Sequence, residues 1–244
     1  MGKKQDITGK RWSGFDWATE QSDIMIVGIG SIGSYVALCL ARSLHSLFLI
    51  DGDEVDETNV QGGQLYRTSD VGKKKVVAVT EICRQFGCTG EIMPVDTMYT
   101  PETGMTDICI CGLDNMAARK LVFESWETHL KNEASEKGTV NDCLFIDGRI
   151  TGELFEAFAI KGNDLEAIEE YKRDWLFNDS VVPDLDCTVK STTFIGMGIA
   201  WNIVSLLNNW LTNKKMGMEL REVPFHSRFY SPIFQVNVSE NVEI

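Results

Sequence analysis

Three glycines, Gly28, Gly30 and Gly33, form a Gly-x-Gly-x-x-Gly motif. The motif follows a short apolar run at 24–28, typical of a buried strand, and precedes an apolar segment at 31–43, typical of a helix packed on a sheet. In this context glycine permits a tight turn and close approach of a phosphate, while the helix N-terminus offers free N–H groups to an anion. The motif therefore indicates a nucleotide-binding loop, although packing alone could also require these glycines.

Asp51 ends the next apolar run, at 47–50, and lies 18 residues after Gly33. A carboxylate at this distance commonly binds the ribose hydroxyls of a nucleotide. The glycine motif and Asp51 fit an NAD-dependent oxidoreductase as well as an ATP-binding protein. The choice between them depends on the residues that follow.

An ordered series of polar motifs follows the second expected strand. Its members are Asp51-Gly-Asp53-Glu-Val55, Asn59-Val-Gln-Gly-Gly-Gln64, Asp70-Val-Gly72-Lys-Lys-Lys75 and Asp114-Asn115-Met-Ala-Ala-Arg119. Together with the glycine motif, this series resembles the ThiF/MoeB/HesA family, the bacterial relatives of ubiquitin-activating enzymes. The resemblance spans roughly residues 11–205. It implies an adenylyltransferase that uses ATP and Mg²⁺ to activate a carboxylate and releases pyrophosphate.

The resemblance also implies a role for each matching side chain. Asp51 would hold the ribose, Lys75 would contact the phosphates, and Asp114 would bind Mg²⁺ directly or through water, as suits a hard oxygen ligand. The other expected nucleotide-binding residues are Gly28, Gly30, Gly33, Asp53, Asn59, Gln64 and Asn115. Each has an ordinary explanation too: a lysine can be a solvated helix start, and an Asp after a strand can cap the next helix.

Two further residues lie at positions where family members carry catalytic groups. Arg11 occupies the region of an arginine finger, which sometimes acts across a dimer interface; a surface residue of the N-terminal arm is the alternative. Cys187 precedes a long apolar helix, at the place of a cysteine that can form a thioester or persulfide. A helix N-terminus and nearby Lys190 would lower the pKa of that thiol, but an ordinary partly buried thiol is the alternative.

The sequence departs from the family pattern beside Gln64. The family's phosphate-contacting Arg-Gln is replaced by Gly62-Gly63-Gln64, which marks a divergent Gly-Gly-Gln-Leu-Tyr branch. Arg67 is the nearest arginine that could replace the missing one. Zinc-binding family members carry two Cys-x-x-Cys pairs, whereas this chain has none, so we expect no zinc.

The alternation of apolar strands and helices in the first half predicts an α/β fold. We expect a doubly wound, Rossmann-like, mostly parallel sheet with helices on both faces and short strands near the C-terminus. Residues 1–22 form an expected arm, and 23–244 a single ThiF-type domain with a crossover at about 163–190. The polar segment at 52–72 is interpreted as a long loop over the site.

The composition of the chain limits the kinds of partner and the cellular compartment that we expect. The net charge of −13 disfavours nucleic acid, whose binding requires neutralisation of phosphates, and suits a basic partner or simply solubility. Seven irregularly spaced cysteines suggest a reducing compartment, and no run of 18 uncharged apolar residues suggests a membrane span, so we expect a cytoplasmic protein.

The favoured hypothesis is adenylation of the C-terminal carboxylate of a ubiquitin-like or sulfur-carrier protein or peptide ending in Gly-Gly. By resemblance we expect a homodimer. The alternatives are a nucleotide-binding scaffold without activity and, less favoured, an NAD-dependent oxidoreductase. The polar loop, Lys75 and the Asp114-Asn115 pair do not call for a nicotinamide.

Overall fold

The structure is a computed structural model of the chain. It describes residues 15–19, 21–138, 140, 142–177 and 191–239. Arg11 and Cys187 lie outside these residues, so the expectations about an arginine finger and a nucleophilic cysteine stay predictions.

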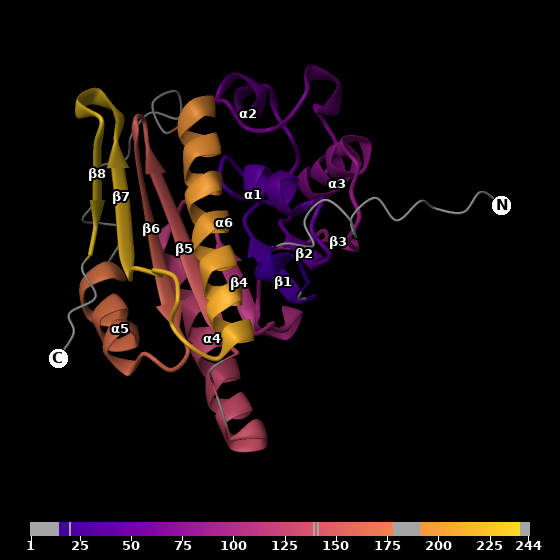
Figure 1. Cartoon of the computed structure of the whole chain (residues 1–244). Coiled ribbons are helices and arrows are strands. Elements are labelled where there is room, and N and C mark those ends of the chain that lie inside the picture. Colours follow the sequence, from indigo (N-terminus) through magenta and orange to yellow (C-terminus); the bar gives the residue numbers. More distant parts are fainter. Residues whose placement is uncertain (1–14, 20, 139, 141, 178–190, 240–244) are drawn as a thin grey trace.

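Eight strands form one sheet in the order β3-β2-β1-β4-β5-β6-β7-β8. The first five strands are parallel, and β6, β7 and β8 join them as antiparallel neighbours. The predicted α/β, mostly parallel sheet with short C-terminal strands is thus confirmed (Figure 1). The strands are β1 (Asp23–Val27), β2 (Ser46–Ile50), β3 (Ile92–Val95), β4 (Ile108–Cys111), β5 (Leu144–Thr151), β6 (Leu154–Lys161), β7 (His226–Tyr230) and β8 (Gln235–Val238).

Helices cover both faces of the sheet because its central strands are apolar on both sides. Along β1, Ile24 and Ile26 face one core, whereas Met25 and Val27 face the other. The first core is closed by α1, α3 and α6, and the second by α4 and α5. The helices are α1 (Gly33–Leu40), α2 (Glu57–Gln61), α3 (Lys75–Phe86), α4 (Met116–Lys137), α5 (Leu165–Glu170) and α6 (Thr193–Met216).

The helix α6 is the main cover of the first core. It packs against α1 and across β5 and β6, and Figure 1 shows it in orange along the front of the sheet. Ile199 and Ile203 point at the backbone of Gly148 on β5. By length and composition α6 could cross a membrane, but this packing against the sheet is that of a core helix.

Several elements were not predicted. The strand β3 is an edge strand in which only Ile92 is buried and Pro94 interrupts the pattern, which an edge position tolerates because one side of the backbone needs no partner. The helix α2 lies inside the expected loop, and none of its five residues is buried, so it has no apolar periodicity. The polar segment at 132–137 forms the end of α4. The expected crossover contains α5 and a π-helical turn, Tyr171–Trp175.

The expected division into an arm at 1–22 and one domain at 23–244 stays a prediction. Within the described residues, one continuous sheet runs from β1 to β8.

Candidate functional site

The sequence motifs meet at the carboxyl edge of the sheet. Strand order reverses between β1 and β4, since β2 and β3 lie on one side of this pair and β5 on the other. At such a switch point the loops that follow the two central strands diverge and leave a crevice for a ligand. The glycine loop follows β1, Asp51 follows β2, and Asp114 follows β4.

Two of the three motif glycines are required by the protein itself. Gly28 has φ +86°, and a Cβ there would lie 3.0 Å from the carbonyl of Gly112. A Cβ on Gly33 would lie 2.0 Å from the carbonyl oxygen of Gly28. These glycines allow β1, α1 and the loop after β4 to pack closely.

Gly30 has no such requirement. Its φ is not positive, and among the described residues the only atom within 4 Å of a Cβ built there is Oε1 of Gln64, 3.9 Å away. A side chain at position 30 would therefore point into open space between the glycine loop and Gln64. This space is where a phosphate could approach the backbone.

Asp51 is buried beside the glycine loop and fixes its shape. Its Oδ2 accepts a hydrogen bond from the N–H of Ile29 (2.7 Å), and its Oδ1 accepts one from the N–H of Asp53 (2.8 Å). Burial raises the pKa of the Asp51 carboxyl above its usual value, while the charge of Lys75 and the two N–H donors oppose this shift. Asp51 thus lies directly against the glycine loop, and its role in holding a ribose stays a prediction.

Lys75 and Asp53 form an ion pair within the same region. The Lys75 Nζ lies 2.8 Å from Asp53 Oδ2, and the backbone N–H of Lys75 donates to the carbonyl of Asp53. Lys75 is nearly buried, whereas Asp53 is half exposed. A solvated helix start is therefore the wrong explanation for Lys75, because its ammonium points inward to the Asp51–Asp53 loop.

The predicted polar residues Asn59 and Gln64 differ in their surroundings. Asn59 closes a capping box on α2, in which its Oδ1 accepts from the N–H of Asp56 and its own N–H donates to the Asp56 carboxylate. Gln64 has a buried Oε1 that finds no hydrogen-bond partner among the described residues, close to the place a Gly30 Cβ would take. An unpaired buried polar atom costs free energy unless a ligand or water satisfies it, so Gln64 is the better candidate for ligand contact.

Asp114 and Asn115 stand at the start of α4. Asp114 is exposed, and Asn115 caps the helix by accepting a hydrogen bond from the N–H of Ala118 (2.8 Å). The helix-cap explanation thus holds for Asn115 rather than for Asp114. Arg119 donates to the carbonyl of Leu113 and pairs with the fully buried Asp147. Arg119 is therefore a positioning residue for the loop that carries Asp114.

The carboxylate of Asp147 is the centre of a buried network that the sequence did not reveal. Besides Arg119, it accepts hydrogen bonds from Arg149 Nε (2.7 Å) and from the Tyr171 hydroxyl (2.8 Å). Burial raises the pKa of Tyr171 to about 12, so its hydroxyl is a donor at neutral pH. The network fastens β5 to α4 and to the π-helical turn.

Arg67 does not take the place of the missing family arginine in this structure. Its guanidinium binds the buried Asp70 carboxylate through two hydrogen bonds (2.8 and 3.0 Å) and donates to Gln85 Oε1 (2.7 Å). These contacts fasten the 3₁₀ turn Thr68–Asp70 to α3.

A hydroxyl relay joins the glycine loop to the residues before α6. The Ser31 and Ser191 hydroxyls lie 2.8 Å apart, and Ser191 Oγ donates to the carbonyl of Gly62 (2.9 Å). Tyr66 donates to the carbonyl of Ile29. Ser31 and Ser191 are 160 residues apart in the sequence, so only the position of Ser31 inside the glycine motif could have indicated this contact.

The comparisons with known proteins agree with this geometry. The ThiF family model matches residues 17–162. Residues of this chain are 33% identical over 108 residues to the adenylyltransferase and sulfurtransferase uba4 of Aspergillus terreus, which covers 42% of this chain and 22% of that protein. They are 30% identical over 110 residues to the NEDD8-activating enzyme E1 catalytic subunit of Caenorhabditis elegans, covering 43% of this chain and 26% of that protein.

Solved structures resemble the fold over nearly the whole chain. The structure of Escherichia coli MccB with ATP has a TM-score of 0.66 at 13% identity and covers 92% of this chain and 64% of that chain. PaaA has a TM-score of 0.65 at 16% identity and covers 91% and 65%. The sequence matches span about a quarter of the length of the curated relatives. Since the family model matches more than half of the residues, the chain belongs to the ThiF family.

Proposed function

We propose that this protein adenylates a carboxylate with ATP and Mg²⁺. The observation that carries the proposal is the open space at Gly30, bounded by the glycine loop and Gln64, at a sheet edge that also holds Asp51, Lys75 and Asp114. Membership of the ThiF family supports the same activity.

Each group has a role that follows from its chemistry. The glycine loop and the N-terminus of α1 offer N–H groups to the phosphates. Asp51 accepts from the ribose hydroxyls with the lone pairs that its two backbone bonds leave. Lys75 releases its half-exposed partner Asp53 and approaches the phosphates. Asp114 is an exposed carboxylate that fits Mg²⁺, which neutralises charge on the phosphate oxygens when bound.

The reaction needs no general base. A substrate carboxylate is already ionised at neutral pH. Its oxygen forms a bond to the α-phosphorus of ATP while the bond from that phosphorus to the bridging oxygen breaks, which gives an acyl-adenylate and pyrophosphate. Charge on the pyrophosphate is stabilised by cations positioned in advance, such as Lys75.

The proposed substrate is the C-terminal carboxylate of a ubiquitin-like or sulfur-carrier protein or of a peptide, with Gly-Gly as its end. Support comes from relatives: uba4 is an adenylyltransferase and sulfurtransferase, and MccB has been solved with the peptide MccA. A basic partner would complement the net charge of −13. Homodimerisation and a cytoplasmic location complete the proposal, with neither nucleic acid nor membrane as a partner.

A nucleotide-binding scaffold without activity is the second candidate. The favouring observation is Arg67, whose guanidinium is held by Asp70 and Gln85 while the family's phosphate-contacting arginine is missing. An NAD-dependent oxidoreductase is less favoured, since Lys75 and Asp114 have no role in binding a nicotinamide.

Ligand-induced stabilisation and pyrophosphate exchange separate these candidates. ATP with Mg²⁺ at about 100 times its Kd should raise the free energy of unfolding by about 2.7 kcal/mol, whereas NAD should have no effect. Exchange of labelled pyrophosphate into ATP that depends on a carrier or peptide supports adenylation. ATP binding without exchange, across a panel of Gly-Gly carriers and peptides, supports the scaffold. Stabilisation by NAD alone contradicts both.

A further inference from the structure

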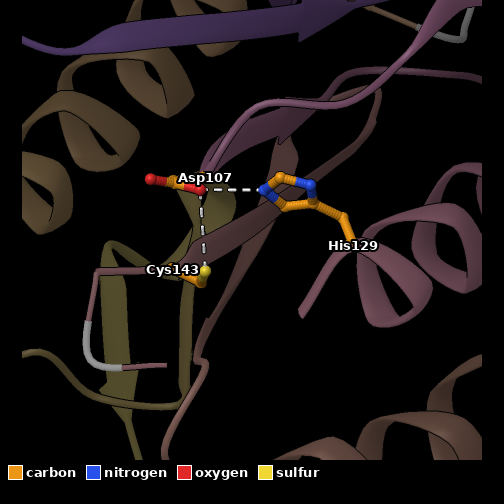
Figure 2. Close-up of side chains that lie close together, drawn as sticks. All are labelled: Asp107, His129 and Cys143. Carbon is orange, nitrogen blue, oxygen red and sulfur yellow. Dashed lines mark hydrogen bonds and ion pairs between the residues drawn. The ribbon is translucent and has the colours of Figure 1, made fainter. Parts of the chain in front are cut away.

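A second group of chemically active side chains lies at the opposite edge of the sheet. We name Asp107, His129 and Cys143 the Asp–His–Cys cluster. Asp107 immediately precedes β4, Cys143 immediately precedes β5, and His129 lies on α4. The cluster is thus at the amino ends of the strands, away from the glycine loop, which follows the carboxyl end of β1. Figure 2 shows the three side chains converging, with dashed lines that join Asp107 to each of the other two.

The ligand atoms of the cluster are close enough to share one metal ion. His129 Nε2 lies 2.8 Å and Cys143 Sγ lies 3.9 Å from the same oxygen, Asp107 Oδ1. All three atoms lie within 4.8 Å of one another. Tetrahedral Zn²⁺ with its usual bond lengths places neighbouring ligand atoms roughly 3.3–3.6 Å apart. Small side-chain rotations therefore suffice to form the site.

The cluster has one buried side and one open side. Cys143 is 1% exposed, whereas the His129 and Asp107 side chains are 22% and 36% exposed. Asp107 and His129 line a cavity of about 610 Å³ together with Glu133, which lies one helical turn after His129. A metal ion here has three protein ligands on one side and room for water or Glu133 on the other.

The donor set selects the kind of metal. Thiolate and imidazole are soft and borderline ligands, which suit Zn²⁺, whereas Mg²⁺ and Ca²⁺ take oxygen ligands. We propose that Asp107, His129 and Cys143 bind one Zn²⁺ that ties β4, α4 and β5 together at the edge opposite the nucleotide site. The thiol of Cys143 loses its proton when the metal–sulfur bond forms, so binding releases a proton to solvent.

This site escapes a search for Cys-x-x-Cys pairs. Its residues come singly from three places in the chain, 22 residues apart for Asp107 and His129 and 36 apart for Asp107 and Cys143. The expectation of no zinc rested on the absence of such pairs and did not consider ligands brought together by strand pairing. In the fold, β4 and β5 are parallel neighbours, with Ile108 opposite Leu144, which brings Asp107 and Cys143 side by side.

The test uses the full chain, stripped of metal with a chelator, and titrates Zn²⁺ and Co²⁺. We expect one ion per chain, and a thiolate-to-cobalt charge-transfer band that disappears in Cys143→Ser. Cys143→Ser and His129→Gln should each weaken Zn²⁺ binding by more than the roughly 10- to 100-fold typical of changes outside the ligand shell. Cys39→Ser is the matched control, since this exposed thiol lies outside the cluster, and it should bind like the unchanged chain.

Two outcomes would overturn the proposal. One is a failure of the unchanged chain to bind stoichiometric Zn²⁺, and the other is a cobalt thiolate band that survives in Cys143→Ser. If Cys143→Ser does not fold, Asp107→Asn carries the test, because that side chain is partly exposed and its loss should weaken Zn²⁺ binding to a similar degree. These readouts do not involve ATP, so they are independent of the proposed adenylation.

Discussion

Gly30 and Gly33 belong to one motif, yet the structure predicts opposite consequences for replacing them with alanine. A Cβ on Gly33 would lie 2.0 Å from the carbonyl oxygen of Gly28, and real Cβ atoms essentially never come within 3.0 Å of another atom. The backbone of β1 or α1 must therefore shift by about 1 Å. Within the part of the chain that the structure describes, a Cβ on Gly30 meets only Gln64, at 3.9 Å.

The magnitudes follow from these contacts. Overpacking of a core typically costs about 1–3 kcal/mol, and for a chain of this size each kcal/mol lowers Tm by about 2–4 °C. Gly33→Ala should thus lower Tm by roughly 2–12 °C. Gly30→Ala should leave Tm unchanged or raise it slightly, because alanine at a compatible backbone position restricts the unfolded chain and contributes about 0.4–1 kcal/mol.

For ATP binding, the informative variant is Gly30→Ala, which should leave the free protein folded. If a phosphate approaches the backbone at Gly30, a methyl group there imposes a similar overpacking of about 1–3 kcal/mol on the complex alone, which weakens ATP binding by about 5- to 150-fold. The assay is a calorimetric titration of ATP with Mg²⁺ into both variants, beside a thermal melt without nucleotide. Gly30→Ala with unchanged ATP affinity would refute the placement of the phosphates, and Gly30→Ala as unstable as Gly33→Ala would refute the packing argument.

Three further predictions concern charge. Burial lowers the pKa of His45 from 6.5 to about 4, so on acidification the unfolded chain takes up this proton before the folded chain does. The free energy of unfolding should therefore fall by about 3 kcal/mol between pH 6.5 and pH 4. Urea titrations should show a smaller fall in His45→Gln, and an equal fall in both proteins would contradict the assignment. Arg119→Met removes a partner of the buried Asp147 and should lower the free energy of unfolding, measured in urea, by about 3 kcal/mol. The control Lys120→Met removes an exposed ion pair on the same helix and should lower it by less than about 1 kcal/mol. Equal losses of stability would show that Arg119 has no special role. Lys75→Met should weaken ATP binding about 10- to 150-fold and AMP binding much less, because the lost hydrogen bond is to the outer phosphates. An equal loss for AMP in calorimetric titrations would show that Lys75 contacts the ribose or the base instead.

Sequence reasoning was strongest where a short motif determines its own geometry. The glycine loop and Asp51 were predicted from residue types at fixed local spacing, and Lys75 from the resemblance to the family; the structure brings all three to one edge of the sheet. The same reasoning missed β3, because Pro94 and an edge position remove its apolar signal.

Contacts between distant segments could not be read in this way. Arg119 meets Asp147 only because β4 and β5 pair in the register that sets Cys111 opposite Asp147. The Asp–His–Cys cluster depends on the same pairing. The residues of such a site can be assigned to one another only when the strand order is known, and a single sequence does not provide that order residue by residue.

The position of α6 has a consequence for the growing polypeptide. The face that it covers belongs to β5, β6 and α1, which are all synthesised before Thr193. A nascent chain can therefore pair its parallel strands while one apolar face of the sheet is still open to solvent, a state that favours aggregation and chaperone binding. We expect ribosome-bound chains that end before α6 to be far more sensitive to protease than chains that include it, because the packing of α6 closes the open apolar face.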